Sequence, residues 1–232
     1  LTGFGANYTF DRFVVGPTNR FAHGAAMGVS QEPGKQFNPL FIYGNSGLGK
    51  THLLHSIGHG LLKQFPKMSV LYINAETFVN EFINSLKNKS IDAHRERYRN
   101  MDCLLIDDIQ FLIGKEQSEQ DFFHTFNALH DSRRQVVLTS DRPPKDLQPL
   151  ESRLISRFEW GIICDIKPPD FETRLAILRK KCELEQINAP DEVLQHLAQN
   201  IRSNVRILEG SLKSLIAFCC LTASPMTLEA AN

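Results

Sequence analysis

Gly44-Asn45-Ser46-Gly47-Leu48-Gly49-Lys50-Thr51 forms a complete G-x-x-x-x-G-K-T phosphate-binding loop. It follows the apolar run Leu40–Tyr43 and opens a stretch whose apolar residues have helical spacing. A strand, a glycine-rich loop and a helix N-terminus in this order surround a phosphate chain with backbone N–H donors. The alternative is a glycine-rich turn without a ligand. We expect Lys50 to reach the β- and γ-phosphates and Thr51 to give its hydroxyl to Mg²⁺.

A second motif lies further along the chain, where a short apolar run ends in two carboxylates, Asp107 and Asp108. A run of this length and composition, Cys103–Asp107, is typical of a strand buried on both faces of a parallel sheet. The carboxyl ends of such strands form the ligand-binding edge of the sheet. We therefore expect Asp107 to hold Mg²⁺ and Asp108 to orient or polarise an attacking water. A solvated pair at a strand end is the alternative.

Composition limits the class of protein. The 232 residues are 42% hydrophobic, and 26 basic residues balance 26 acidic ones, so a folded chain without net charge is expected. A protein that holds duplex DNA by charge alone is usually basic, so any nucleic-acid contact needs a local patch. The sequence has no long apolar run and no signal sequence, which predicts no membrane span. Five cysteines without C-x-x-C spacing indicate free thiols in the cytoplasm.

Apolar patterns along the chain alternate between strand and helix, which predicts an α/β fold with a five-stranded parallel sheet flanked by helices. The expected strands are Leu40–Tyr43, Ser69–Asn74, Cys103–Asp107, Gln135–Thr139 and Gly161–Ile166. The helical patterns are His52–Phe65, Thr77–Lys87, Gln117–Ser132, Phe171–Gln186, Asp191–Asn200 and Val205–Leu221. Because Pro168-Pro169 interrupts the pattern, we predict a nucleotide-binding domain over 1–167 and a small all-helical lid over 168–232.

Basic residues gather between the second and third expected strands, where an extra helical pair interrupts the β-α rhythm. Arg95 and Arg99 are four residues apart and share a helix face. This region either contacts nucleic acid or forms a solvated face with Asp92 and Glu96 as the compensating charges. Its basic residues are Lys87, Lys89, Arg95, Arg97 and Arg99.

Three further polar residues lie where a bound triphosphate could meet them. Asp141 follows the fourth expected strand, at the edge of the sheet that faces the ligand. Arg157, in a short helical turn that also carries Arg153, could reach the γ-phosphate of a neighbouring subunit or form a surface ion pair. Arg206 begins the last helix of the lid, where a cation could touch the phosphates.

With these residues assembled, the chain resembles the ATP-binding domain (domain III) of the bacterial chromosomal replication initiator family DnaA, a branch of the AAA+ proteins. The matching segments follow the order of the family over nearly the whole chain. They are Tyr8-Thr9-Phe10-Asp11-Arg12-Phe13-Val14-Val15-Gly16, Asn19-Arg20-Phe21-Ala22, the phosphate-binding loop with His52-Leu53-Leu54, Leu105-Ile106-Asp107-Asp108-Ile109-Gln110-Phe111, Phe122-Phe123-His124-Thr125-Phe126-Asn127, Leu138-Thr139-Ser140-Asp141-Arg142, Ser156-Arg157-Phe158 and Ser203-Asn204-Val205-Arg206.

This resemblance implies roles for individual residues. Asp141 would be the first sensor of the nucleotide, Arg157 the inter-subunit arginine finger and Arg206 the second sensor, on the lid. Lys50, Thr51, Asp107 and Asp108 would bind and position ATP and Mg²⁺, with Thr51 and Asp107 on the metal side. The nucleotide contacts would come from Val14, Val15 and Gly16 around adenine, from Asn45, Ser46, Gly47, Leu48, Gly49, Lys50, Thr51 and His52 around the phosphates, and from Arg206.

The resemblance also assigns a role to the extra helical pair, which corresponds to the initiator-specific element of the family. Ile83, Lys87 and Arg95 would then contact single-stranded DNA. Two residues depart from the family pattern. Gln117 replaces an arginine of many relatives, which puts the strand contact in doubt, and Ile207 replaces a glutamate beside Arg206.

The resemblance implies an ATP-dependent initiator of chromosomal replication that binds ATP or ADP with Mg²⁺ and assembles head to tail on DNA at the origin. Hydrolysis by such a nucleotide switch would be slow. The alternatives are an ADP-bound regulatory adaptor of the initiator and a helicase-loader ATPase, so a replicative helicase and an adaptor are candidate partners. Because no duplex-reading helix-turn-helix follows residue 232, we expect an isolated core or a truncated paralogue.

Overall fold

The structure is a computed structural model that describes residues 3–148 and 150–231. Contacts divide the chain into two compact units. The first holds residues 3–13, 21–44 and 50–165, and the second holds 14–20, 45–49 and 166–231. The main division thus falls between Asp165 and Ile166, close to the proline pair. Two short upstream segments join the helical unit, which the apolar pattern did not indicate.

The first unit is built on a parallel sheet of five strands, as the sequence predicted. The strand order, which the sequence did not predict, is β2-β3-β4-β1-β5. Its register pairs Leu40 of β1 with Val137 of β4 and with Ile162 of β5. Each strand differs from its expected range by at most one residue at either end. The strands are β1 (Leu40–Tyr43), β2 (Val70–Asn74), β3 (Cys103–Asp107), β4 (Gln135–Ser140) and β5 (Ile162–Asp165).

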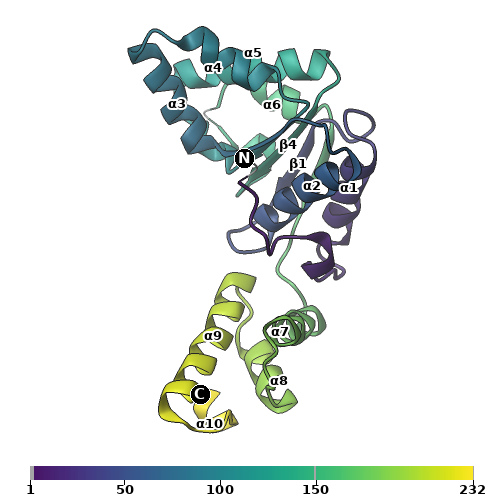
Figure 1. The fold of residues 1–232 in the computed structure, drawn as a ribbon, viewed down its shortest axis with the longest axis vertical. Helices are drawn as coiled ribbons and strands as arrows, with labels where there is room; N and C mark the ends of the chain where they lie inside the picture. Colours follow the sequence, from purple (N-terminus) through teal and green to yellow (C-terminus); the bar gives the residue numbers. More distant parts are fainter. Residues whose placement is uncertain (1–2, 149, 232) are drawn as a thin grey trace. The chain divides into compact units, whose positions relative to one another are not determined.

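Helices cover both faces of this sheet, which explains why its strands are continuous apolar runs. Alternate strand residues, such as Leu104 and Ile106 of β3, join one core with helices α3 to α6. The residues between them, including Leu105 and Asp107, face the side on which α2 packs against β2, β3 and β4. Figure 1 shows α1 and α2 on one side of the sheet and α3 to α6 on the other.

The predicted helices of the first unit form within two residues of their expected ends. The helix α1 was not predicted, because its buried face uses small residues such as Ala22, Ala25 and Ala26 rather than a row of large apolar ones. The helices are α1 (Arg20–Gln31), α2 (Lys50–Gln64), α3 (Ala75–Lys87), α4 (Ile91–Arg99), α5 (Glu116–Asp131) and α6 (Ser152–Phe158), with single turns η1 (Phe10–Arg12), η2 (Ile109–Leu112) and η3 (Pro144–Asp146).

The second unit is helical and has its own core, formed around Leu178, Leu194 and Leu212. Side chains cap two of its helices: Asp170 accepts the backbone N–H of Thr173, and Asn204 accepts that of Ile207, both at 2.8 Å. Its helices are α7 (Phe171–Glu185), α8 (Asp191–Asn200), α9 (Val205–Thr222) and the unpredicted α10 (Leu228–Ala231).

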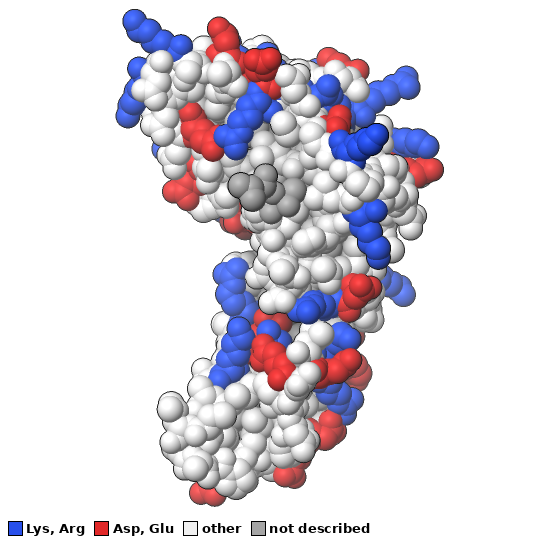
Figure 2. Space-filling model, in the orientation of Figure 1, with Lys and Arg blue, Asp and Glu red and all other residues white. Residues whose placement is uncertain are grey.

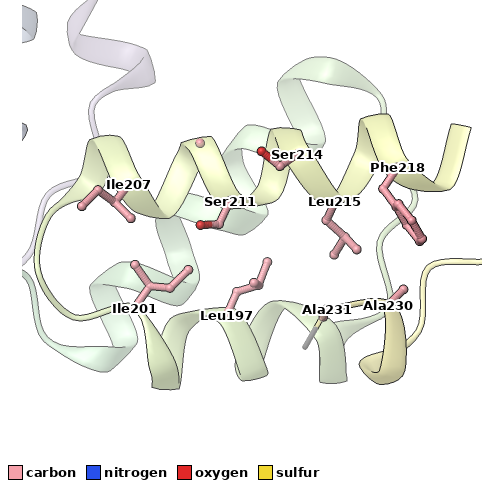
Figure 3. Close-up of a pocket in the computed structure, with 10 residues that line it drawn as sticks. Leu197, Ile201, Ile207, Ser211, Ser214, Leu215, Phe218, Ala230 and Ala231 are labelled. Atoms are coloured by element: carbon pink, nitrogen blue, oxygen red, sulfur yellow. The ribbon is translucent and has the colours of Figure 1, made fainter. Parts of the chain in front are cut away.

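An open groove of about 550 Å³ lies within this helical unit. Figure 3 shows its apolar side chains directed toward one another from α9 on one side and from α8 and α10 on the other. Ile207, which departs from the family pattern, is one of them and is 50% exposed. The lining residues are Leu197, Ile201, Ile207, Gly210, Ser211, Ser214, Leu215, Phe218, Ala230 and Ala231.

Charged side chains of both signs are interspersed over the face of each unit in Figure 2, in keeping with the zero net charge. Lysine or arginine side chains extend from the edge of the first unit that carries α3 and α4. Within the described residues, no helix is both long enough and apolar enough to cross a membrane.

Candidate nucleotide-binding site

The phosphate-binding loop begins where β1 ends. The backbone N–H of Gly44 donates to the carbonyl oxygen of Ser140 on β4 at 3.2 Å, which fixes the start of the loop to the sheet. Gly47 and Gly49 have φ values of 78° and 98°, which side chains rarely adopt. Lys50 is only 6% exposed, and its Nζ donates to the carbonyl oxygen of Gly44 at 2.6 Å. The side chain of Lys50 therefore reaches back to Gly44, the first residue of the motif.

Asp107 is the centre of a buried polar cluster at the carboxyl end of β3. Its Oδ2 accepts the hydroxyl of Thr51 at 2.7 Å, and its Oδ1 accepts the hydroxyl of Thr139 from the neighbouring strand β4. Asp107 as a whole is 3% exposed. The structure thus brings together the two residues that were predicted to hold Mg²⁺, from α2 and β3. Carboxylate and hydroxyl oxygens are the ligands that this hard cation prefers, so the pair fits it.

Tyr72 on β2 also bonds to Asp107, with its hydroxyl donating to Oδ2 at 3.2 Å. Burial, reinforced by the negative charge of Asp107, raises the pKa of Tyr72, so the phenol remains a proton donor. His55 of α2 packs against this ring with a centroid separation of 4.2 Å. His55 itself accepts the backbone N–H of Gly5 on Nδ1 at 3.2 Å, and burial lowers its pKa, so the ring is neutral.

Asp108 turns away from Asp107 because its backbone is left-handed, with φ 56° and ψ 56°. Gln110 joins it to the next strand end: its Nε2 donates to Oδ1 of Asp108 at 3.1 Å, and its Oε1 accepts the backbone N–H of Asp141 at 3.3 Å. The carboxylate of Asp141 pairs with Arg142 at 2.8 and 2.9 Å. This bonding lowers the pKa of Asp141, and the charge of Lys50 adds to the effect.

The middle of the loop, Asn45–Gly49, belongs to the second unit and lies against the start of α9 there. The backbone N–H of Val205 donates to the carbonyl oxygen of Gly47 at 3.1 Å. A Cβ placed on Gly47 would lie 3.1 Å from the Cβ of Arg206. The second unit therefore brings Arg206, predicted to sense the nucleotide, next to the backbone predicted to surround the phosphates.

The segment Val14–Gly16 is held in the second unit by Asn19. Its side chain accepts the backbone N–H of Gly16 at 2.8 Å and donates to the carbonyl oxygen of Val14 at 3.0 Å. A Cβ on Gly16 would lie 2.2 Å from Oγ1 of Thr173 on α7, so the close approach requires glycine. Val15, at the centre of the segment, is 47% exposed and available for contact with a flat ring.

His52 was predicted to contact the nucleotide together with the phosphate-binding loop. In the structure its ring contacts the backbone, with Nε2 2.8 Å from the carbonyl oxygen of Thr9. On α6, Arg157 packs on aromatic rings, with its guanidinium carbon 3.8 Å from the centroid of Trp160 and 5.8 Å from that of Phe123. These contacts present the arginine at the surface of the first unit.

The basic residues of α3 and α4 have partners that the sequence did not suggest. Nε of Arg95 donates at 2.8 Å to Asp121 of α5, a carboxylate with a side chain only 1% exposed. Arg97 pairs with Glu81 at 2.7 Å. Asp121 and Glu81 thus compensate Arg95 and Arg97, in place of the Asp92 and Glu96 of the alternative interpretation. Ile83 is 38% exposed, and Lys87 and Lys89 are exposed.

Sequence reasoning did not single out four residues that shape the site: Asn19, Tyr72, Gln110 and Thr139. Asn19, Gln110 and Thr139 occur inside the segments that match the family, but the sequence alone did not assign them a role. Tyr72 lies inside an expected strand as an ordinary β-forming aromatic residue. Only the pairing of β2, β3 and β4 shows that its hydroxyl meets a carboxylate.

Comparison with known proteins identifies relatives over the whole chain. The bacterial DnaA ATPase domain model matches residues 4–165. The curated chromosomal replication initiator protein DnaA of Caldanaerobacter subterraneus subsp. tengcongensis is 53% identical over 229 residues. This match covers 99% of the chain but 52% of the relative, so the chain spans about half the length of that protein.

Solved structures agree with these matches. Domain III of the replication initiation protein DnaA from Thermotoga maritima has a TM-score of 0.96 at 46% identity, over 99% of this chain and 96% of that one. A replication initiator DnaA bound to AMPPCP and single-stranded DNA has a TM-score of 0.85 at 38% identity, over 92% of this chain and 66% of that one. The chain therefore belongs to the bacterial DnaA ATPase domain family and has its AAA+ fold.

Proposed function

We propose that this chain is the ATP-responsive core of a chromosomal replication initiator, acting in the cytoplasm. The observation that carries the proposal is the bonding of Thr51 on the phosphate-binding loop helix to Asp107 at the end of β3, beside the buried Lys50. A related initiator is bound to AMPPCP and to single-stranded DNA, which supports both ligands for this chain.

The site binds ATP or ADP through its phosphates. Backbone N–H groups of residues 45–51 and the ammonium group of Lys50 contact the phosphates, and Val14, Val15 and Gly16 line the adenine. Thr51 and Asp107 would hold Mg²⁺, which would supply positive charge to offset that of the phosphates. Asp108, fixed by Gln110, orients the attacking water. Asp141 and Arg206 respond to the presence of the γ-phosphate.

Assembly completes the site. Arg157 contacts the γ-phosphate bound to the adjoining subunit, where a cation stabilises the charge that develops during hydrolysis. A head-to-tail contact of this kind uses two different surfaces, so it repeats along a filament unless the rotation closes a ring. Because the cation comes from a partner, hydrolysis is slow and resets a switch between the ATP and ADP states.

The surface formed by α3 and α4 contacts one DNA strand at the origin. Ile83 offers an exposed apolar side chain for a base, and Lys87 offers an exposed cation for a phosphate. Arg95 contributes less, because its Nε already bonds to the buried carboxylate of Asp121. Because phosphate contacts contribute to the affinity, binding of single-stranded DNA should weaken as the salt concentration rises.

The experiment that tests assembly compares sedimentation and ATP hydrolysis of wild type and Arg157→Ala with ATP and with ADP. We expect the variant to bind ATP normally as a monomer but to lose ATP-dependent association and hydrolysis. Arg179→Ala, an exposed arginine of α7 paired with Asp191, is the matched control and should behave as wild type. Unchanged association of Arg157→Ala would exclude the role in the neighbouring site.

The same experiment separates the initiator from an ADP-bound adaptor and from a helicase loader. An adaptor prefers ADP and remains small in both nucleotides, whereas the proposed switch associates only with ATP. A loader retains a replicative helicase in a pull-down, and an initiator binds the helicase and its regulatory adaptor as further partners. The intact set of Asp107, Asp108, Asp141 and Arg206 favours a protein that responds to ATP.

A further inference from the structure

The side chain of Arg157 rests on an aromatic support that no part of the nucleotide chemistry explains. Its guanidinium carbon lies 3.8 Å from the centroid of the Trp160 ring. A guanidinium at this distance over an indole face is a cation–π contact, for which tryptophan is the most favourable ring. Trp160 is 57% exposed, so neither burial nor core packing requires a large aromatic side chain at this position.

A series of ring contacts connects the exposed indole to the core of the first unit. Phe126 of α5 is fully buried, and the ring of His130, one helical turn later, stacks on it at 6.0 Å with an interplanar angle of 9°. The ring of His130 then meets Trp160 edge to face at 5.2 Å. The indole therefore has Arg157 and His130 as neighbours, and this arrangement limits its rotation.

We infer that Trp160 is a positioning residue, which holds Arg157 in one orientation before a second subunit arrives; this inference rests on the proposed inter-subunit role of Arg157. A free arginine side chain has many rotamers, and ordering it on assembly costs conformational entropy. The Trp160 ring is held in place through His130 and the buried Phe126. Stacking on this ring therefore orders Arg157 before assembly, which removes much of the entropic cost of assembly. Phe123, at 5.8 Å from the guanidinium carbon, borders the same position.

The composition of the chain provides a spectroscopic test, because Trp160 is its only tryptophan. In the full chain without nucleotide, Arg157→Ala uncovers one face of the indole. We expect collisional quenching of the emission by acrylamide to rise about twofold relative to wild type, as one of two ring faces becomes accessible. Arg179→Ala, remote in sequence on α7, should leave the quenching unchanged. Equal quenching in Arg157→Ala and wild type would overturn the stack.

The functional test compares Trp160→Leu and Trp160→Phe with wild type in ATP-dependent sedimentation and hydrolysis. Trp160→Leu removes the ring face, and we expect the rate of hydrolysis in the assembled state to fall about tenfold, the effect of one cation–π contact. Trp160→Phe retains a weaker ring face and should recover part of the rate. ATP affinity of the unassembled variants should equal that of wild type, which separates positioning from a general loss of structure.

The outcomes distinguish this inference from the function on which it rests. If Arg157→Ala loses assembly while Trp160→Leu hydrolyses ATP as wild type does, the inter-subunit role stands and the positioning role is overturned. If Arg157→Ala assembles normally, the proposed function fails first. Should Trp160→Leu fold poorly, which thermal unfolding would reveal, Trp160→Phe and the quenching measurement still decide the case.

Discussion

The Asp107 cluster of the first unit and the Gly47–Arg206 corner of the second hold their polar groups in different ways. Asp107 is 3% exposed and accepts bonds from side chains on three different elements: α2, β2 and β4. Arg206 is exposed at the first turn of a helix, and its neighbour Val205 reaches Gly47 through a backbone bond. A buried network fixes one geometry, whereas a helix end leaves a long side chain adjustable.

This difference matches the demands of the proposed chemistry. A metal-holding carboxylate must keep its orientation before nucleotide binds, because misplacement weakens every later contact. A residue that distinguishes ATP from ADP must instead respond to one phosphate, and an exposed cation near the loop can do so. Substitutions in the first unit should therefore abolish binding or stability, and those in the second should change the preference between nucleotides.

The largest effect is expected for Lys50→Ala. The ammonium group lies within the loop, so its removal loses charge-assisted bonds to phosphate, and ATP affinity should fall about 100-fold by calorimetry. Lys63→Ala, at the exposed far end of the same helix, is the control and should bind ATP as wild type does. Comparable affinity in Lys50→Ala and Lys63→Ala would show that the loop does not bind phosphate.

Asp107→Asn compared with Asp108→Asn tests the fixed geometry. The two carboxylate oxygens of Asp107 accept hydrogen bonds from Thr51, Tyr72 and Thr139, whereas the asparagine side chain has only one acceptor oxygen. One donor therefore loses its partner, and the free energy of unfolding should drop by about 2 kcal/mol in denaturant titrations. Mg²⁺-dependent stabilisation of bound ATP should disappear as well. Asp108→Asn should retain both properties and slow only hydrolysis. The reverse order of effects would contradict the assignment of the two carboxylates.

Arg206→Ala tests whether the exposed Arg206 side chain near Gly47 distinguishes ATP from ADP. We expect the ratio of ATP to ADP affinity to fall about tenfold, because one charge-assisted contact to the terminal phosphate is lost. Thermal stability should hardly change, since Arg206 is exposed. Arg202→Ala, an exposed arginine just before α9, is the matched control. A loss of ATP and ADP affinity in equal measure would assign Arg206 to general binding instead of sensing.

The smallest expected effect is on the pH dependence of stability, and it arises from His55 in the first unit. Burial lowers the pKa of His55 in the folded chain, so below about pH 6.5, the unperturbed value, the unfolded state binds more protons. Stability should therefore decrease as pH falls through this range and level off above it. His55→Asn keeps an acceptor for Gly5 without titrating, so its urea midpoints at pH 5.5 and 7.5 should lie closer together than those of wild type.

The sequence by itself determined the elements that carry the chemistry. The phosphate-binding loop, the strand ending in Asp107 and Asp108, the parallel sheet and the helical segment after Pro169 all follow from patterns within a few residues. Such patterns reflect local geometry: glycines at positive φ, apolar runs for buried strands and periodic apolar residues for helices. They identified the family as well, because its motifs are equally local.

Only the tertiary structure decided which side chains meet. Thr139 and Tyr72 bond to Asp107 because β3 lies between β4 and β2, and strand order is not encoded in the pattern of any one strand. Arg95 meets Asp121 for a similar reason, because α4 packs on α5. Each contact joins residues far apart in the chain, so it depends on how whole elements pack, a property that no short stretch of sequence contains.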